Sequence, residues 1–115
     1  QKELRALYSQ CDFLIFPSPC ENFAYTLVEA MSCGAAIVSS NTTAMPETCQ
    51  NAAVYFDPND VSDMSIKISD LMNDESVRND LKLKAINRSK ELPDYEVGTE
   101  MLLSIMKKLF NSKIT

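Results

Sequence analysis

Glu21 and Glu29 are the residues of this sequence best suited to chemistry, because they bracket the predicted start of a helix near Tyr25. The first turn of a helix leaves backbone amides unpaired, so the amides of Ala24, Tyr25 and Thr26 are predicted to offer a partial positive charge suited to phosphate. A carboxylate accepts hydrogen bonds from two hydroxyls of a sugar or ribose. Together these groups fit a nucleoside diphosphate sugar. The spacing alone also allows Glu21 to cap the helix and Glu29 to be a solvated surface residue.

Histidine is absent from the sequence, and this absence narrows the possible chemistry. The chain can form neither a Ser-His-Asp nor a Cys-His catalytic unit by itself, nor a histidine-ligated metal site. The four cysteines are irregularly spaced without a C-x-x-C pair, which favours reduced cytosolic thiols over disulfides or zinc ligands. They are Cys11, Cys20, Cys33 and Cys49. Carboxylates, backbone amides or groups from elsewhere must therefore carry any reaction.

The composition is that of one globular domain, with 115 residues of which 45% are hydrophobic and 23% are charged. A net charge of −5 without a basic stripe argues against nucleic acid as a partner. No apolar run approaches the roughly 20 residues of a transmembrane helix, and residues 1–5 do not resemble a secretory signal. We expect a piece of a longer protein in the cytoplasm, or at the inner face of a membrane through that parent.

Apolar periodicity and turn signals divide the chain into alternating strands and helices. The predicted strands are residues 13–16, 35–39 and 53–56, and the predicted helices are residues 2–10, 25–33, 45–50, 60–72, 75–91 and 94–111. Gly34 is expected to end its helix in a left-handed conformation, and Asp60 to cap the start of another. The alternation predicts an α/β fold, a Rossmann-like parallel sheet of about three strands with helices on both faces.

The loop at residues 18–24 follows the first predicted strand, and ligands of such sheets bind beyond the carboxyl ends of the strands. The polar residues 39–42 follow the second strand, where they could line the rim of the same pocket or simply be solvated. A signalling receiver domain has similar length and alternation, but it needs an acidic cluster at the strand ends. The first strand here ends in Pro17 and Ser18, which argues against that class.

Residues 17–34, PSPCENFAYTLVEAMSCG, resemble the signature P-S-x-x-E-G-F-G-L-x-x-x-E-A-M-A-C-G of glycosyltransferase family four, the glycosyl transferases group 1. These are retaining, nucleotide-sugar-dependent enzymes of the GT-B fold. The resemblance covers about residues 4–90, and its downstream parts are Ile37-Val38-Ser39, Met45-Pro46-Glu47, Asn51-Ala52-Ala53 and Asp57-Pro58-Asn59-Asp60. It implies that residues 1–115 are the second half of the C-terminal, donor-binding domain.

The resemblance also implies a role for each matching residue. Glu21 would contact hydroxyls of the transferred sugar as the catalytic residue, and Glu29 would bind the ribose hydroxyls. Ala24, Tyr25 and Thr26 would donate their amides to the diphosphate. No metal or cofactor is implied beyond the nucleotide diphosphate sugar itself.

The sequence departs from the family signature around Phe23, where Asn22 and Ala24 replace two glycines. Asn22 places a side chain at the mouth of the sugar pocket, and Tyr25 stands where the family often has leucine. These two residues could tune the choice of donor or be neutral. Phe23 could either wedge the loop against the core or contact the donor.

The phosphate-clamping Arg and Lys of this family, and its N-terminal acceptor domain, precede the matched region. We therefore expect the isolated piece to transfer no sugar. We also expect it to self-associate through the exposed edge of its first strand or through the apolar stripe of its last helix. A non-catalytic nucleotide-sugar-binding or scaffold domain derived from a glycosyltransferase is the alternative function.

Overall fold

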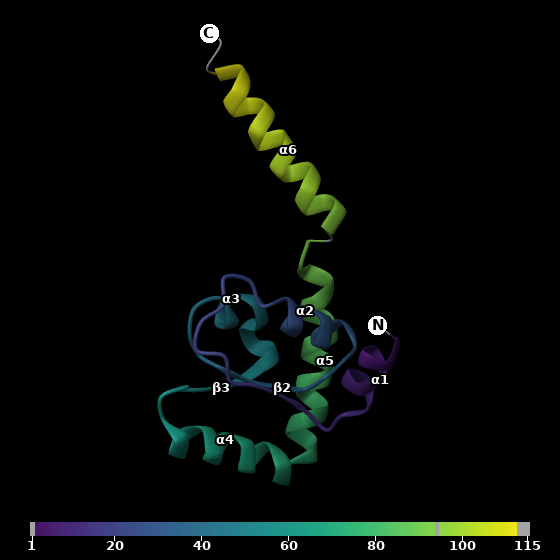
Figure 1. The fold of residues 1–115 in the computed structure, drawn as a ribbon. Helices are drawn as coiled ribbons and strands as arrows, with labels where there is room; N and C mark the ends of the chain where they lie inside the picture. The colour runs from purple at the N-terminus through teal and green to yellow at the C-terminus, as the bar shows by residue number, and fades with distance from the viewer. Residues whose placement is uncertain (1, 94, 113–115) are drawn as a thin grey trace.

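The structure is a computed structural model that describes residues 2–93 and 95–112. Its elements are α1 (Lys2–Gln10), β1 (Leu14–Phe16), α2 (Tyr25–Ser32), β2 (Ile37–Ser40), α3 (Met45–Cys49), the 3-10 helix η1 (Gln50–Ala52), β3 (Ala53–Phe56), α4 (Val61–Asn73), α5 (Glu75–Glu91) and α6 (Tyr95–Ser112). The order of strands and helices is the predicted one (Figure 1). Where an observed boundary differs from the predicted one, the difference is one or two residues. The predicted first residue of the last helix, Asp94, lies outside the described residues.

The three strands form the predicted parallel sheet, and their order in it is β1-β2-β3. Leu14 of β1 pairs with Ile37 of β2, which pairs in turn with Ala53 of β3. All four residues of β2 are buried because this strand is central and helices cover both faces. The edge strand β1 is only partly buried, and Ile15 remains 42% exposed on it.

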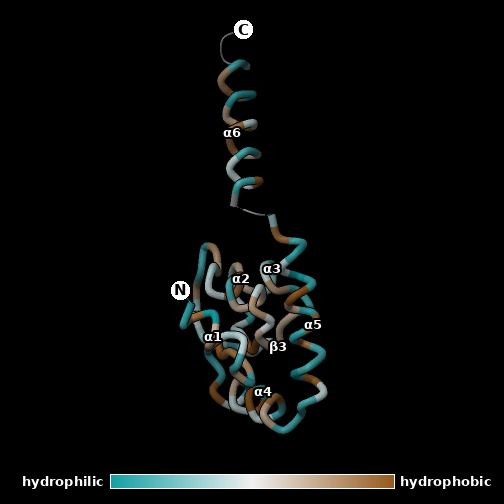
Figure 2. The backbone as a smooth tube through the Cα atoms, turned by 90° about the vertical axis from the view of Figure 1, so that its right-hand side faces the viewer, coloured by the Kyte–Doolittle hydropathy of each residue, from teal (hydrophilic) through white to brown (hydrophobic). Residues whose placement is uncertain are grey.

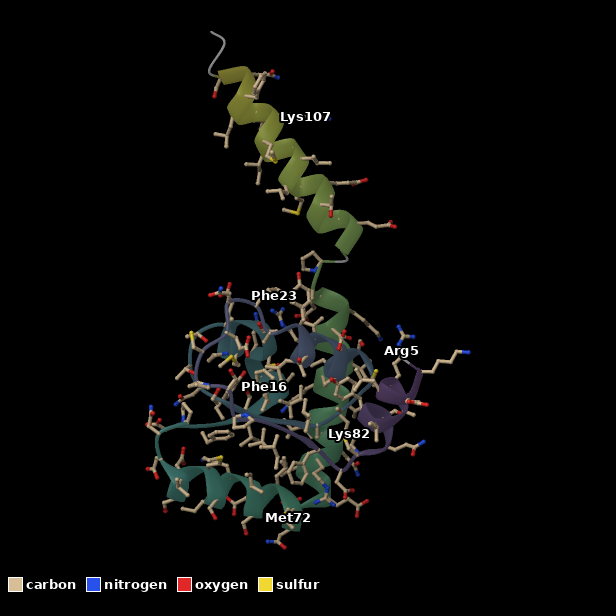
Figure 3. All side chains as sticks on the ribbon, in the orientation of Figure 1. Arg5, Phe16, Phe23, Met72, Lys82 and Lys107 are labelled. Atoms are coloured by element: carbon tan, nitrogen blue, oxygen red, sulfur yellow. The ribbon has the colours of Figure 1, made fainter. Side chains whose placement is uncertain are left out.

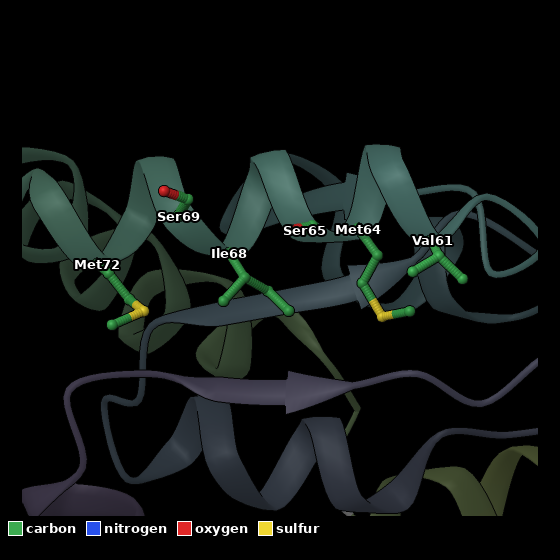
Figure 4. A pocket seen from close by; sticks show the side chains of 6 residues that line it. All are labelled: Val61, Met64, Ser65, Ile68, Ser69 and Met72. Carbon is green, nitrogen blue, oxygen red and sulfur yellow. The ribbon is translucent and has the colours of Figure 1, made fainter.

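Two apolar layers enclose the sheet, one on each face. Buried side chains of α2, including Leu27 and Met31, pack on one face together with Ile37. On the other face Val38 and Phe56 pack against Leu71 of α4. Figure 1 shows α4 on the opposite side of the strands from α2 and α3, and Figure 4 shows Met64 and Ile68 pointing from α4 toward the strands. The prediction of helices on both faces is confirmed.

Local signals in the sequence set the ends of these helices. The Asp60 carboxylate accepts hydrogen bonds from the amides of Ser62 and Asp63, which confirms the predicted cap of α4. Gly34 follows α2 with φ 75°, which confirms its predicted left-handed conformation. The turn at Gly34 directs the chain from α2 back to β2, so it fixes the position of α2 on the sheet.

Helix α6 projects away from the rest of the molecule (Figures 1 and 2). With α6 included, the structure extends over 62 × 32 × 22 Å. The large apolar side chains of α6 are exposed to solvent. They are Val97, Met101, Leu102, Leu103, Ile105, Met106, Leu109 and Phe110. No helix among the described residues has the length and apolar character needed to cross a membrane.

We predict that Gly34→Ala lowers the free energy of unfolding by about 1–2 kcal/mol, because an L-residue is unfavourable in the left-handed region. The added Cβ would also lie 3.1 Å from Cδ1 of Ile86. Gly98→Ala in α6 is the matched control, since its Cβ would meet nothing within 4 Å. This second change should leave the free energy of unfolding unchanged or raise it by up to about 1 kcal/mol. Urea unfolding of both variants checks the contrast, and equal losses would contradict it.

Candidate functional site

Two loops meet at the carboxyl edge of the sheet and form the centre of the candidate site. Residues 17–24 follow β1 and residues 41–44 follow β2, so parallel pairing brings both loops to the same edge. The hydroxyl of Thr42 donates a hydrogen bond to the carbonyl of Pro19 at 2.9 Å, and the hydroxyl of Ser40 donates to the carbonyl of Ser18. The end of β2 and the second loop therefore hold the first loop in place through the side chains of Ser40 and Thr42.

Glu21 lies in the first loop as a half-buried carboxylate. The hydroxyl of Ser18 donates to its Oε1 at 2.8 Å, and the Glu21 amide donates to Oγ1 of Thr43 at 3.0 Å. The side chain of Glu21 does not cap α2, whose N-cap residue is Ala24 without a side-chain cap. A carboxylate has about four acceptor positions, so the single bond from Ser18 leaves capacity for hydroxyls of a ligand.

The start of α2 offers fewer amides than the sequence predicted. The amide of Tyr25 donates to the carbonyl of Phe23 at 3.1 Å, because the chain turns tightly as it enters the helix. The prediction that the Tyr25 amide is unpaired was therefore wrong. Within the described chain the amides of Ala24 and Thr26 have no backbone acceptor. Ala24 itself is buried in the apolar layer under α2.

Glu29 lies on the exposed surface of α2, in its second turn. It lines a small hollow of about 110 Å³ between α1 and α2 together with Arg5 and Tyr8. Burial and the nearby charge of Glu29 raise the pKa of the Tyr8 hydroxyl. Like any tyrosine it is protonated at neutral pH, and it can donate a hydrogen bond. The carboxylate thus shares its surroundings with a cation and a hydroxyl, rather than standing alone in solvent.

Phe23 and Tyr25 form an exposed aromatic pair, with ring centroids 4.5 Å apart at an interplanar angle of 59°. Phe23 is 50% exposed and Tyr25 is 62% exposed, so Phe23 does not wedge the loop against the core. Figure 3 shows Phe23 at the end of the molecule from which α6 projects. The two rings line a groove of about 780 Å³ that also includes Leu92 of the α5–α6 connection and Leu102 of α6. This volume lies within the range of small-molecule sites.

The buried Cys49 provides no reactive group for this site. All four are free thiols, as the sequence predicted. Cys49 is fully buried, and its burial raises the pKa of the thiol to about 12, so the thiolate needed for nucleophilic attack is not formed. Within residues 2–93 and 95–112 no group of three or more His, Cys, Asp and Glu side chains is placed to hold a metal ion. Carboxylates and amides remain the available functional groups.

The hydroxyls of Ser40, Thr42 and Thr43 hold the first loop, a role that the sequence did not predict for any of them. Residues 39–42 were expected either to line the pocket rim or to be solvated. The structure instead buries Ser39 and Ser40 completely. A cluster of hydroxyl residues directly after a predicted strand was the available signal, but the partners lie 22 and 23 residues earlier in the chain.

The sequence of the chain matches a known protein family. Residues 1–88 match the family described as Glycosyl transferases group 1. The chain belongs to this family, and the match contains the whole β1–α2 segment with Glu21 and Glu29.

Several curated relatives are glycosyltransferases. The chain is 38% identical over 87 residues to the serotype-specific mannosyltransferase WbdA of Escherichia coli, a match that covers 76% of this chain and 11% of the relative. It is 34% identical over 108 residues to the O-antigen chain mannosyltransferase B of Escherichia coli, covering 94% of this chain and 28% of that protein. The chain thus spans only a minor part of the length of these relatives.

A solved structure confirms the fold. The sucrose-phosphate synthase from Thermosynechococcus elongatus superimposes with a TM-score of 0.84 over 96% of this chain and 28% of that one. The sequence identity is 21%, so this likeness bears on the fold alone. The predicted Rossmann-like α/β fold of the GT-B type is confirmed.

We predict that Glu29→Ala in the full-length protein weakens binding of a plain nucleoside diphosphate about 10- to 150-fold, the effect of losing hydrogen bonds to a charged group. Titration calorimetry with UDP and GDP measures this affinity without any sugar. The control is Glu3→Ala, which removes an exposed carboxylate from neighbouring α1 without touching the hollow. If Glu29→Ala binds as tightly as Glu3→Ala, Glu29 is only a solvated helix residue.

Proposed function

We propose that this chain is the donor-binding half of the C-terminal domain of a longer retaining glycosyltransferase, which transfers a hexose from a nucleoside diphosphate sugar to an acceptor. The observation that carries the proposal is the position of the Glu21 carboxylate, within the segment that matches the family. Its carboxylate is fixed by Ser18 and is not used to cap the adjacent helix. The family match over residues 1–88 supports the class of reaction.

The proposed donor lies across the start of α2, between the two carboxylates. Glu21 accepts hydrogen bonds from hydroxyls of the transferred sugar and acts as the catalytic residue. The amides of Ala24 and Thr26 bind the diphosphate, supported by the positive end of the helix dipole. Glu29 binds the ribose hydroxyls from the hollow that it shares with Arg5.

Phe23 and Tyr25 form the outer wall of this proposed donor site. Their exposed rings line the groove of about 780 Å³, which adjoins the start of α2 at Tyr25. Such rings pack against the C–H groups of sugars or against a base. Tyr25 contributes its ring rather than its amide, since that amide is engaged with the Phe23 carbonyl.

The proposed mechanism is a front-face displacement with retention. The bond between the anomeric carbon and the leaving phosphate oxygen breaks, and the acceptor oxygen forms a bond to the anomeric carbon on the same face. The acceptor proton passes to the leaving phosphate oxygen, so charges and atoms balance. Positioning and stabilisation of the departing phosphate supply the rate increase, and no metal is required in this scheme.

We further propose mannose as the transferred sugar, because two Escherichia coli relatives are named mannosyltransferases. An Arg and a Lys from preceding parts of the parent complete the phosphate site, and an N-terminal domain binds the acceptor. The isolated segment is therefore expected to be inactive and to self-associate through β1 or α6. We place the parent in the cytoplasm.

We predict that Glu21→Ala in the full-length protein lowers kcat/KM about 10- to 150-fold, because hydrogen bonds to a buried sugar are lost in the transition state. Transfer assays with GDP-mannose, UDP-glucose and UDP-N-acetylglucosamine identify the donor first, and the variant is then compared on that donor. Glu75→Ala removes an equivalent carboxylate at the start of α5 and serves as the control. A wild-type kcat/KM in Glu21→Ala would contradict the role assigned to Glu21.

The wild-type protein tests the alternative function. If it binds a nucleotide sugar but transfers sugar from none of them, the non-catalytic alternative is favoured.

A further inference from the structure

Thr43 has a backbone conformation that a β-branched residue rarely adopts. Its φ is 47°, in the left-handed region that glycine enters freely and threonine enters only against steric resistance. Thr43 lies in the loop after β2, is exposed to solvent and has no place in the apolar core. Backbone strain of this kind persists where the surrounding structure or a function requires it.

The contacts of the Thr43 hydroxyl connect Glu21 to the core. Oγ1 accepts a hydrogen bond from the Glu21 amide at 3.0 Å. The same hydroxyl donates its proton toward the Sδ of Met45 at 3.8 Å, and Met45, the first residue of α3, is fully buried. Since the hydroxyl proton is directed to Met45, a lone pair of Oγ1 is left for the Glu21 amide. Glycine at this position would relieve the strain but would provide no acceptor for Glu21.

Two hydroxyls near Thr43 in the sequence hold the residues that precede Glu21 in the loop after β1. The fully buried Ser40 donates to the carbonyl of Ser18, and Thr42 donates to the carbonyl of Pro19. The Ser18 side chain in turn donates to the Glu21 carboxylate. Glu21 is thus held in two ways. Its amide bonds directly to Thr43, and its carboxylate bonds to Ser18, whose carbonyl is bonded to Ser40 at the end of β2.

We propose that Thr43 is a positioning residue, which fixes Glu21 relative to the start of α2 so that its carboxylate meets the sugar of the donor. This inference rests on the proposed function, since the role of Glu21 does. Thr43 touches neither donor nor acceptor in this scheme. Its hydroxyl acts through the Glu21 backbone, and its left-handed conformation brings that hydroxyl to the Glu21 amide.

Three substitutions of Thr43 in the full-length protein separate the effect of its hydroxyl from the effect of its backbone strain. Thr43→Ser keeps the hydroxyl and should keep kcat within about twofold of the wild type. Thr43→Val keeps the shape without an acceptor, and Thr43→Gly removes both the acceptor and the strain. Both should lower kcat about 3- to 10-fold, as expected for one lost hydrogen bond. Thr43→Gly should do so with an unchanged or higher Tm, whereas a purely structural role would lower kcat only together with Tm.

A double-mutant cycle with Glu21→Gln tests whether Thr43 acts through Glu21. Thr43→Gly should lower kcat further by less than about twofold when Glu21 is already replaced, because coupled residues are not additive. Independent, multiplicative losses would overturn the proposal, and so would a wild-type kcat in Thr43→Gly.

Hydrogen exchange of the Glu21 amide, followed by mass spectrometry of the full-length protein, tests the contact without any activity. Exchange should be faster in Thr43→Gly and Thr43→Val than in the wild type and in Thr43→Ser. Equal exchange in all four proteins would overturn the inference even if the enzyme is active. Absence of sugar transfer by the wild type would instead overturn the proposed function, while the exchange rates would still decide whether Thr43 holds Glu21.

Discussion

The central strand β2 is the constraint on which the rest of the structure depends. Its four residues are buried, with Ile37 in the apolar layer under α2 and Val38 in the layer under α4. Its last two residues are serines, and a buried hydroxyl without a partner would be costly. Ser39 donates to the carbonyl of Ser40, and Ser40 donates to the carbonyl of Ser18. The polar end of β2 is therefore stable only while the loop after β1 stays against it, which keeps Glu21 at the carboxyl edge of the sheet.

Features that depend on local chemistry were predictable from the sequence. The left-handed turn at Gly34 and the cap at Asp60 follow from the residue type and from the periodic segments beside them. The parallel direction of the strands follows from the alternation of strands and helices. The positions of Glu21 and Glu29 around the start of α2 follow from the same local pattern, because helix geometry fixes which residues flank the first turn.

Features that depend on distant partners were not predictable. Arg88 of α5 donates to the carbonyls of Glu47 and Thr48, 41 and 40 residues earlier, and so covers the end of α3. Nothing beside Arg88 in the sequence indicates those acceptors. Thr43 likewise reads as a polar loop residue, because its strain and its bond to Glu21 arise only when the two loops meet. The amide of Tyr25 was misassigned for a related reason: a residue pattern locates the helix start but not the turn that leads into it.

The most direct test of the account is a crystal structure of the full-length protein with an intact nucleoside diphosphate sugar. The diphosphate should lie at the amides of Ala24 and Thr26, with sugar hydroxyls within hydrogen-bond distance of the Glu21 carboxylate and ribose hydroxyls at Glu29. The Thr43 hydroxyl should keep its contact with the Glu21 amide in that complex. A donor bound elsewhere on the sheet edge, with neither carboxylate in contact with it, would contradict the central claim.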